Sequence, residues 1–146
     1  MHDEHAERVK KELVQAGLSK IAMLRFSTAF AHKIIRADEH IHAAVYGHRE
    51  VEPGGVFGYE EGLMIATNQR IIYLVHRPGF TKTDEMGYDM VRGVKISYAG
   101  IFCSIQLHTL HGKIGTFKLA FARRRPARRF VDFVNEHSIS KSVDEE

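Results

Sequence analysis

The stretch Gly62-Leu-Met-Ile-Ala-Thr-Asn-Gln-Arg-Ile-Ile-Tyr-Leu-Val75 decides the fold of this chain. Two apolar, β-prone segments flank a polar break, Thr67-Asn68-Gln69-Arg70. Asn tolerates the left-handed backbone that a tight hairpin needs, so Asn68-Gln69 is predicted to form a two-residue turn. We expect strands at about 62–67 and 70–76, and we expect Thr67 and Arg70 to fix the turn through side-chain hydrogen bonds.

The same two-residue period extends on both sides of this hairpin. Further strands are predicted at residues 40–46, 80–86, 91–98, 101–110 and 113–121, separated by turn signals such as Arg77-Pro78-Gly79 and His111-Gly112. In the fifth of the resulting seven strands, Val94, Ile96 and Tyr98 share one face. In the last two strands, the inward residues are predicted to be Ile101, Cys103, Ile105, Leu107, Phe117, Leu119 and Phe121. Pro126 then suits the first turn of a helix whose apolar face is Phe130, Phe133 and Val134.

Helical spacing replaces this pattern before residue 38. Residues 3–16 form one predicted helix, which Gly17 ends, and Ser19 is placed to cap a second helix over 19–36. In the second helix the apolar stripe is Met23, Phe26, Phe30 and Ile34. Such a stripe needs a cover, so we expect it to dock on the following domain or on a second copy of the chain. A helix for a partner or a membrane surface is the other interpretation.

The chain resembles the bacterial PH-like domains of the YokE-like group. The resemblance is carried by Gly62–Val75, by Tyr88-Asp89-Met90-Val91, and by Phe130-Val-Asp-Phe-Val134, and it extends over about residues 40–137. It implies a mainly β (α+β) fold, a seven-stranded antiparallel barrel with a C-terminal helix that plugs its open corner. The divisions expected are a helical extension at 1–38, the PH-like domain at 39–139 and a flexible tail at 140–146. Such folds host many unrelated functions, so the resemblance implies no particular activity.

Composition is that of one globular domain. The 146 residues are 44% hydrophobic and 27% charged, with a formal net charge of +3. The N-terminus lacks an apolar signal segment, and a single cysteine excludes an intramolecular disulfide. These features favour a cytoplasmic location.

An arginine cluster, Arg123, Arg124, Arg125, Arg128 and Arg129, lies where the last strand meets the last helix. Positive side chains oppose the helix dipole there, and a bound anion would relieve that conflict. We therefore consider a phosphate as the ligand of this anion-binding candidate, carried by a lipid headgroup or a nucleic-acid backbone, with an acidic protein as a further possibility. The alternative is a solvated face neutralised by Asp132, Glu136 or the glutamate-rich loop. Phosphoinositide binding by the first two strands is not expected, because that segment carries Glu50, Glu52, Glu60 and Glu61 against the single base Arg49.

Other polar residues give weaker signals. His40 and His42 are two apart on a strand and could share a metal, with His108 and His111 as further candidates, but nothing completes the ligand set. Cys103 alternates with isoleucine and leucine and is interpreted as a small core residue. Asp38-Glu39 is interpreted as a cap or a solvated pair. We predict no catalytic residues, no metal and no cofactor.

The sequence therefore favours a non-enzymatic interaction module that binds a protein partner or its own copy as an oligomer. The second hypothesis is a peripheral protein that binds anionic lipid or phosphate through Arg123–Arg129. Nucleic-acid binding is not expected, because the aromatic residues near the arginines, Phe117, Phe121, Phe130 and Phe133, are predicted to face inward.

Overall fold

The computed structural model describes residues 3–50, 59–109 and 116–138, and side chains throughout these ranges except at positions 50, 59, 116–118, 120 and 121. The helices are α1 (Glu4–Gln15), α2 (Lys20–Met23), α3 (Phe26–Phe30), η1 (Ala31–Lys33), η2 (Tyr88–Met90) and α4 (Arg124–His137). The strands are β1 (Ile41–Glu50), β2 (Tyr59–Thr67), β3 (Ile71–Arg77), β4 (Phe80–Met86), β5 (Val91–Ala99), β6 (Phe102–Thr109) and β7 (Thr116–Arg123). No helix in the described ranges is long and apolar enough to span a bilayer.

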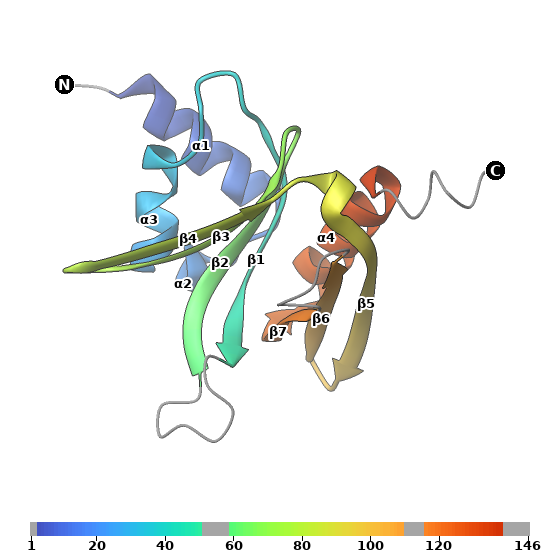
Figure 1. Ribbon diagram of the computed structural model, residues 1–146. Helices are drawn as coiled ribbons and strands as arrows, with labels where there is room; N and C mark the ends of the chain where they lie inside the picture. Colours follow the sequence, from blue (N-terminus) through green and yellow to red (C-terminus); the bar gives the residue numbers. More distant parts are fainter. Residues whose placement is uncertain (1–2, 51–58, 110–115, 139–146) are drawn as a thin grey trace.

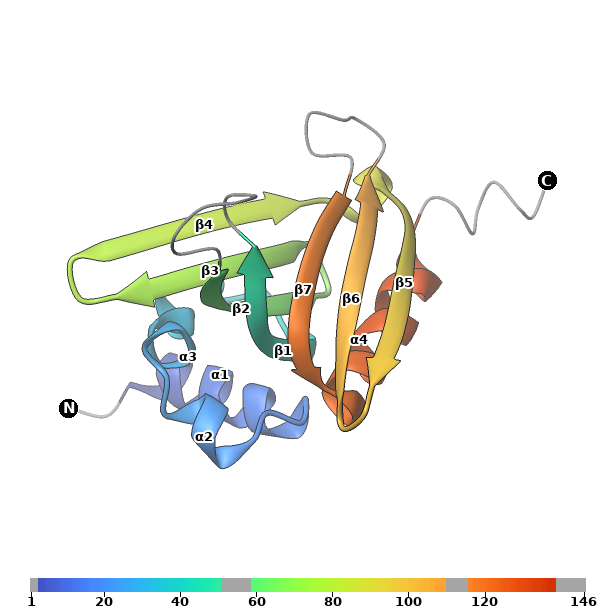
Figure 2. The ribbon, with the colours of Figure 1, turned by 90° about the horizontal axis from the view of Figure 1, so that it is seen from below.

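The seven antiparallel strands have the order β4-β3-β2-β1-β7-β6-β5. Strand β1 pairs with β2 along its whole length, whereas the pairing with β7 seen in the described residues is limited to His48 and Arg49. The sheet therefore folds into two parts, β1–β4 and β5–β7, which Figures 1 and 2 show at a steep angle. Helix α4 lies against the second part (Figure 2), where a PH-like fold places its plug helix.

The β2–β3 turn lies where the sequence predicts it. The Thr67 N–H donates to the Arg70 carbonyl (2.9 Å), and the Thr67 hydroxyl accepts from the N–H groups of Gln69 (3.0 Å) and Arg70 (3.1 Å). Asn68 does more than turn the chain, because its side-chain oxygen accepts from the His40 N–H (2.8 Å). The predicted structural role of Thr67 in the turn is confirmed.

Both faces of β1–β3 are buried, which explains why their sequence is continuously apolar. One face lies in a core with β5–β7 and α4, and includes Met64, Ile71 and Tyr73. The other face lies under the N-terminal helices, where Leu63, Ile65, Ile72 and Leu74 pack against Val9, Leu13 and Ile35. The N-terminal segment therefore docks on the sheet of its own chain.

The prediction of one continuous helix over 19–36 is wrong. The segment is three short pieces, broken at Arg25, whose backbone is extended (φ −76°, ψ 153°). Met23, Phe30 and Ile34 pack against the core, but Phe26 is 59% exposed. Tertiary contacts account for the break, because the Ser27 hydroxyl accepts from the His76 N–H (2.9 Å) and Phe30 stacks on the His76 ring. The predicted ends nearby are confirmed: Gly17 has φ 107° after α1, and Ser19 caps α2.

Three apolar positions differ from their predicted burial. Phe130 and Val134 are fully buried, but Phe133 is only half-buried, between the rings of His42 and His137. Ile101 does not continue the inward row of Cys103, Ile105 and Leu107, because it lies in the β5–β6 turn and is 66% exposed. Tyr98 is also exposed, unlike Val94 and Ile96. The predictions for the side chains of Phe117 and Phe121, for His111, and for the tail at 140–146 lie outside the described residues.

Candidate functional site

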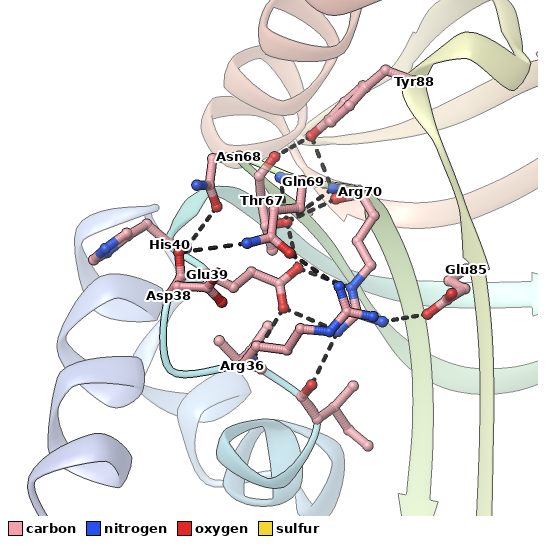
Figure 3. Close-up of polar contacts among 12 residues, drawn as sticks. Arg36, Asp38, Glu39, His40, Thr67, Asn68, Gln69, Arg70, Glu85 and Tyr88 are labelled. Atoms are coloured by element: carbon pink, nitrogen blue, oxygen red, sulfur yellow. Dashed lines mark hydrogen bonds and ion pairs between the residues drawn. The ribbon is translucent and has the colours of Figure 1, made fainter.

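Glu39 is the centre of a polar network between the N-terminal segment and the β2–β3 turn, and its side chain is fully buried. Its carboxylate accepts two hydrogen bonds from the Arg70 guanidinium, each 2.9 Å long. The Thr67 hydroxyl donates a third (2.6 Å) and the Arg36 N–H a fourth (3.1 Å). Figure 3 shows these groups converging from the segment before β1 and from the β2–β3 turn.

The network holds Glu39 ionised. Burial alone would raise the pKa of this carboxyl, but the hydrogen bonds from Arg70, Thr67 and the Arg36 N–H outweigh burial and lower it to about 2. Arg70 also donates to the Ile34 carbonyl (3.0 Å) and to Glu85 of β4. Because both oxygens of Glu39 accept hydrogen bonds from the hairpin or its own segment, this site joins the N-terminal segment to the hairpin.

Sequence reasoning missed Glu39, which the Asp38-Glu39 pair presents as a solvated charge. Its side-chain partners, Arg70 and Thr67, lie about 30 residues away, and the nearby Arg36 contributes a backbone N–H, so no local pattern of side chains indicates the network. The sequence singles out Arg70 as part of the hairpin motif but predicts that its side chain fixes the turn, whereas its guanidinium bonds Glu39, the Ile34 carbonyl and Glu85. Gly62 of the same motif also has a structural cause: a Cβ there would lie 2.5 Å from the Tyr73 ring.

The five predicted arginines of the anion-binding candidate are all exposed at the start of α4. They do not form one compact cluster. The Arg124 guanidinium lies over the Tyr98 ring, 4.6 Å from its centroid, and Arg128 donates to the Tyr98 hydroxyl (3.4 Å). Arg129 turns the other way and donates to the Gln15 carbonyl at the end of α1 (2.8 Å).

A shallow open depression of about 460 Å³ is lined by Arg125, Arg128, Arg129, Asp132, Phe133 and Glu136. Its two carboxylates partly neutralise it, since Arg128 forms an ion pair with Asp132 (3.4 Å). Arg123 at the N-cap makes no side-chain capping bond. Arg128 is therefore partly neutralised by Asp132 although it also contacts Tyr98, the residue over which Arg124 lies.

The two candidate metal ligands point to different partners. His40 lies next to Glu12 of α1 (2.9 Å), whereas the His42 ring stacks on Phe133 of α4, 4.9 Å away. Within the described residues, no group of three or more histidine, cysteine or acidic side chains is placed to hold a metal ion. Cys103 is buried as predicted, and burial raises the pKa of its thiol despite the nearby Arg124.

Among the exposed apolar side chains of the described residues are two groups that the sequence does not indicate. Ile21, Leu24 and Phe26 lie at the junction of α2 and α3, and Leu24 is 84% exposed. Tyr98, Ile101 and Phe102 lie at the tip of the β5–β6 hairpin. Exposed apolar groups of this kind commonly mark interaction surfaces.

Comparison with solved structures gives distant similarities. One is to a DUF1696 family protein with a pleckstrin-homology domain from Shewanella loihica PV-4, at 11% identity and a TM-score of 0.48, covering 73% of this chain and 88% of that one. Another is to the hSac2 domain of the human phosphoinositide phosphatase Sac2, at 12% identity and a TM-score of 0.45, covering 77% of this chain and 76% of that one. No curated protein matches the chain.

The sequence itself assigns the family. Residues 35–136 match the profile of the bacterial PH domain family, bPH_3. The matched range begins in the segment that carries Glu39 and ends inside α4, so it includes the hairpin motif and the plug helix. The resemblance stated above is confirmed: this chain belongs to the bacterial PH domain family.

Proposed function

We propose that this chain is a non-catalytic interaction module that binds a protein partner through the α2–α3 surface, defined by Ile21, Leu24 and Phe26. The observation that carries the proposal is the exposure of Leu24, which has 84% of its surface in contact with solvent on a short helical turn. Burying one such side chain at an interface contributes about 1.5–3 kcal/mol. A few side chains of this kind commonly dominate a protein–protein interface.

The charges beside this surface indicate the chemistry of the partner. Lys20 and Arg25 flank the apolar side chains, and both are exposed. A partner with an apolar groove and carboxylates at its rim would complement them. A second copy of this chain is the other form of the proposal, but in a two-fold interface it would bring these bases toward one another.

The reactive groups support a non-catalytic role. Cys103 is buried with a raised thiol pKa, which disfavours the nucleophilic thiolate. The buried carboxylate of Glu39 is committed to Arg70 and Thr67, so it is not available as a base toward a substrate.

A pair of charge substitutions tests the proposal. Leu24→Asp introduces a carboxylate on the α2–α3 surface, and Ile101→Asp introduces the same group at the hairpin tip as the matched control. Both positions are exposed, so both variants should melt at the temperature of the parent. In cross-linking pull-downs of the full chain, the partner should be lost with Leu24→Asp and retained with Ile101→Asp. Equal recovery by all three proteins would overturn the proposal.

Self-association is tested on the same proteins. Sedimentation velocity over a concentration series would show a larger species for the parent if the partner is a second copy, and Leu24→Asp should abolish that species. A parent that sediments as a monomer, together with a partner sensitive to Leu24→Asp, identifies a different protein.

A second candidate function is anion binding by the arginine cluster. It is favoured by the exposure of Arg124, Arg125 and Arg128, two of which, Arg124 and Arg128, contact the exposed aromatic Tyr98. Changing these three arginines to serine should weaken binding to polyphosphate by about one to two orders of magnitude, at ~1 kcal/mol per base. If the arginines are only a solvated face, the parent should not bind polyphosphate at ~0.15 M salt.

A further inference from the structure

The β5–β6 hairpin ends in apolar side chains that the fold does not bury. Gly100 turns the chain with φ 64°, and Ile101 follows it with 66% of its surface exposed. Tyr98 and Phe102, on either side of the turn, are 47% and 38% exposed. Because the alternation of β6 would have buried Ile101, its exposure is a property of the turn and not of the strand.

Arginines surround this tip on both faces of the hairpin. Phe102 pairs across the strands with Arg123, and directly paired residues project to the same side of a sheet. On the other side, Arg124 lies over the Tyr98 ring and Arg128 donates to its hydroxyl. Figure 2 shows the start of α4 next to the β5–β6 turn. We call Tyr98, Ile101 and Phe102, together with Arg123, Arg124 and Arg128, the basic hairpin tip.

We propose that the basic hairpin tip docks on the surface of an anionic phospholipid bilayer. Ile101 enters the boundary between headgroups and acyl chains, Tyr98 lies at headgroup level, and the arginines contact lipid phosphates. This inference rests on the anion-binding candidate above and deepens it by naming the occupant. It is independent of the α2–α3 surface.

The basic hairpin tip combines positive charge with an exposed apolar side chain, and the surface of an anionic bilayer matches both. Arginines alone would suit any polyanion, since their attraction requires only charge. An exposed isoleucine between them gains nothing from free phosphate, whereas the bilayer boundary offers apolar volume directly beneath a phosphate layer. Aromatic side chains with a polar end favour that boundary too. A single-stranded nucleic acid is a poorer match, because its bases would have to stack on the Tyr98 ring, which Arg124 already covers.

The composition of the chain offers a direct probe, because it contains no tryptophan. Ile101→Trp places a single reporter at the tip. With phosphatidylglycerol-containing vesicles, its emission should shift to shorter wavelength and be quenched by brominated acyl chains, while pure phosphatidylcholine vesicles should leave it unchanged. The matched control is Phe80→Trp, at the tip of the β3–β4 hairpin, where Phe80 is also exposed and Arg77 stacks on its ring (4.3 Å). The control reporter should not respond.

Binding measurements separate insertion from simple charge attraction. Ile101→Ser should weaken co-sedimentation with phosphatidylglycerol vesicles about tenfold or more, as expected for one buried aliphatic side chain, and leave polyphosphate binding unchanged. Phe80→Ser should change neither. The triple change Arg124→Ser, Arg125→Ser and Arg128→Ser should weaken both by about one to two orders of magnitude.

Three results would overturn the inference. The first is that the parent does not bind phosphatidylglycerol vesicles at ~0.15 M salt. The second is that the emission of Ile101→Trp does not shift with these vesicles. The third is that Ile101→Ser and the parent bind the vesicles equally well. Polyphosphate binding that persists in any of these cases would leave the anion-binding candidate intact and remove only the bilayer. Loss of polyphosphate binding as well would remove both.

Discussion

Replacing Glu39 by glutamine should make the chain markedly less stable and change how its stability depends on pH. The substitution keeps the shape of the side chain but removes the charge that accepts from Arg70, Thr67 and the Arg36 N–H. Removing one partner of a buried ion pair typically costs about 3–5 kcal/mol, because the other charge stays buried without compensation. Arg70 keeps its bond to Glu85, so we expect the lower end of that range.

The pH dependence follows from the pKa of Glu39. It is lowered from 4.5 to about 2, because hydrogen bonds from Arg70 and Thr67 outweigh the effect of burial. At ~1.4 kcal/mol per pH unit, this difference contributes ~3 kcal/mol to the stability of the folded chain at neutral pH. A lowered carboxyl pKa stabilises above the pKa of the unfolded chain, so the contribution is lost as pH falls from about 4.5 to about 2.

Urea unfolding of parent and variant at a series of pH values measures both effects. The difference in unfolding free energy should be about 3 kcal/mol at pH ~7 and should have fallen by about 2 kcal/mol at pH ~3. Other carboxyls titrate in both proteins and cancel, including Glu12: burial would raise its pKa, but hydrogen bonds with the Ile41 N–H, His40 and Arg8 together lower it. Glu85→Gln is the matched control: it removes the exposed partner of the same arginine and should cost under ~1 kcal/mol. A Glu39→Gln difference below ~1 kcal/mol, or one independent of pH, would refute the role assigned to the network.

Three further perturbations test the packing. Phe130→Ala should lower the free energy of unfolding by about 3–5 kcal/mol, and Phe133→Ala should lower it clearly less, because the Phe133 ring is half exposed. Equal melting temperatures for the two variants would contradict the placement of α4. Gly62→Ala should lower the free energy of unfolding by about 1–3 kcal/mol, because the new methyl group forces Tyr73 aside. Gly93→Ala is the control in the same urea titration, because its Cβ would meet open space. Deleting residues 1–37 should uncover the outer face of β1–β3 and cause aggregation, which light scattering would detect; a soluble truncated chain of unchanged hydrodynamic behaviour would argue against docking.

The fold was predictable because its main signals are local. The hairpin at Gly62–Val75 combines a run of β-prone residues with a polar break, and the Thr67 hydroxyl closes the turn within four residues. The apolar face of α4 also repeats at helical spacing, which predicts Phe130 and Val134 correctly. Each of these features can be read within a window of about fifteen residues.

The misses share a different physical cause, because each depends on a contact that is distant in sequence. Glu39 looks like a surface acid until the fold brings Arg70 to it. The 19–36 segment has a helical period, but its bonds to His76 on β3 bend the chain at Arg25. Ile101 follows the alternation of β6, but the turn carries it out of the core. Periodicity indicates the secondary structure that a segment favours by itself. The conformation and burial at these positions depend on contacts with distant parts of the chain.

The places available to a partner follow from how the sheet is covered. In many half-buried sheets one face is free, but here the N-terminal helices cover the outer face of β1–β3 and the second half of the barrel covers the inner one. Binding through the faces of these strands would require displacing a core. Exposed apolar groups remain where elements end or break, as at Leu24 and at Ile101. These two positions belong to separate elements, so substitutions at one should leave binding at the other unchanged. We therefore expect single substitutions to separate the two proposed activities, protein binding around Leu24 and binding to an anionic surface around Ile101.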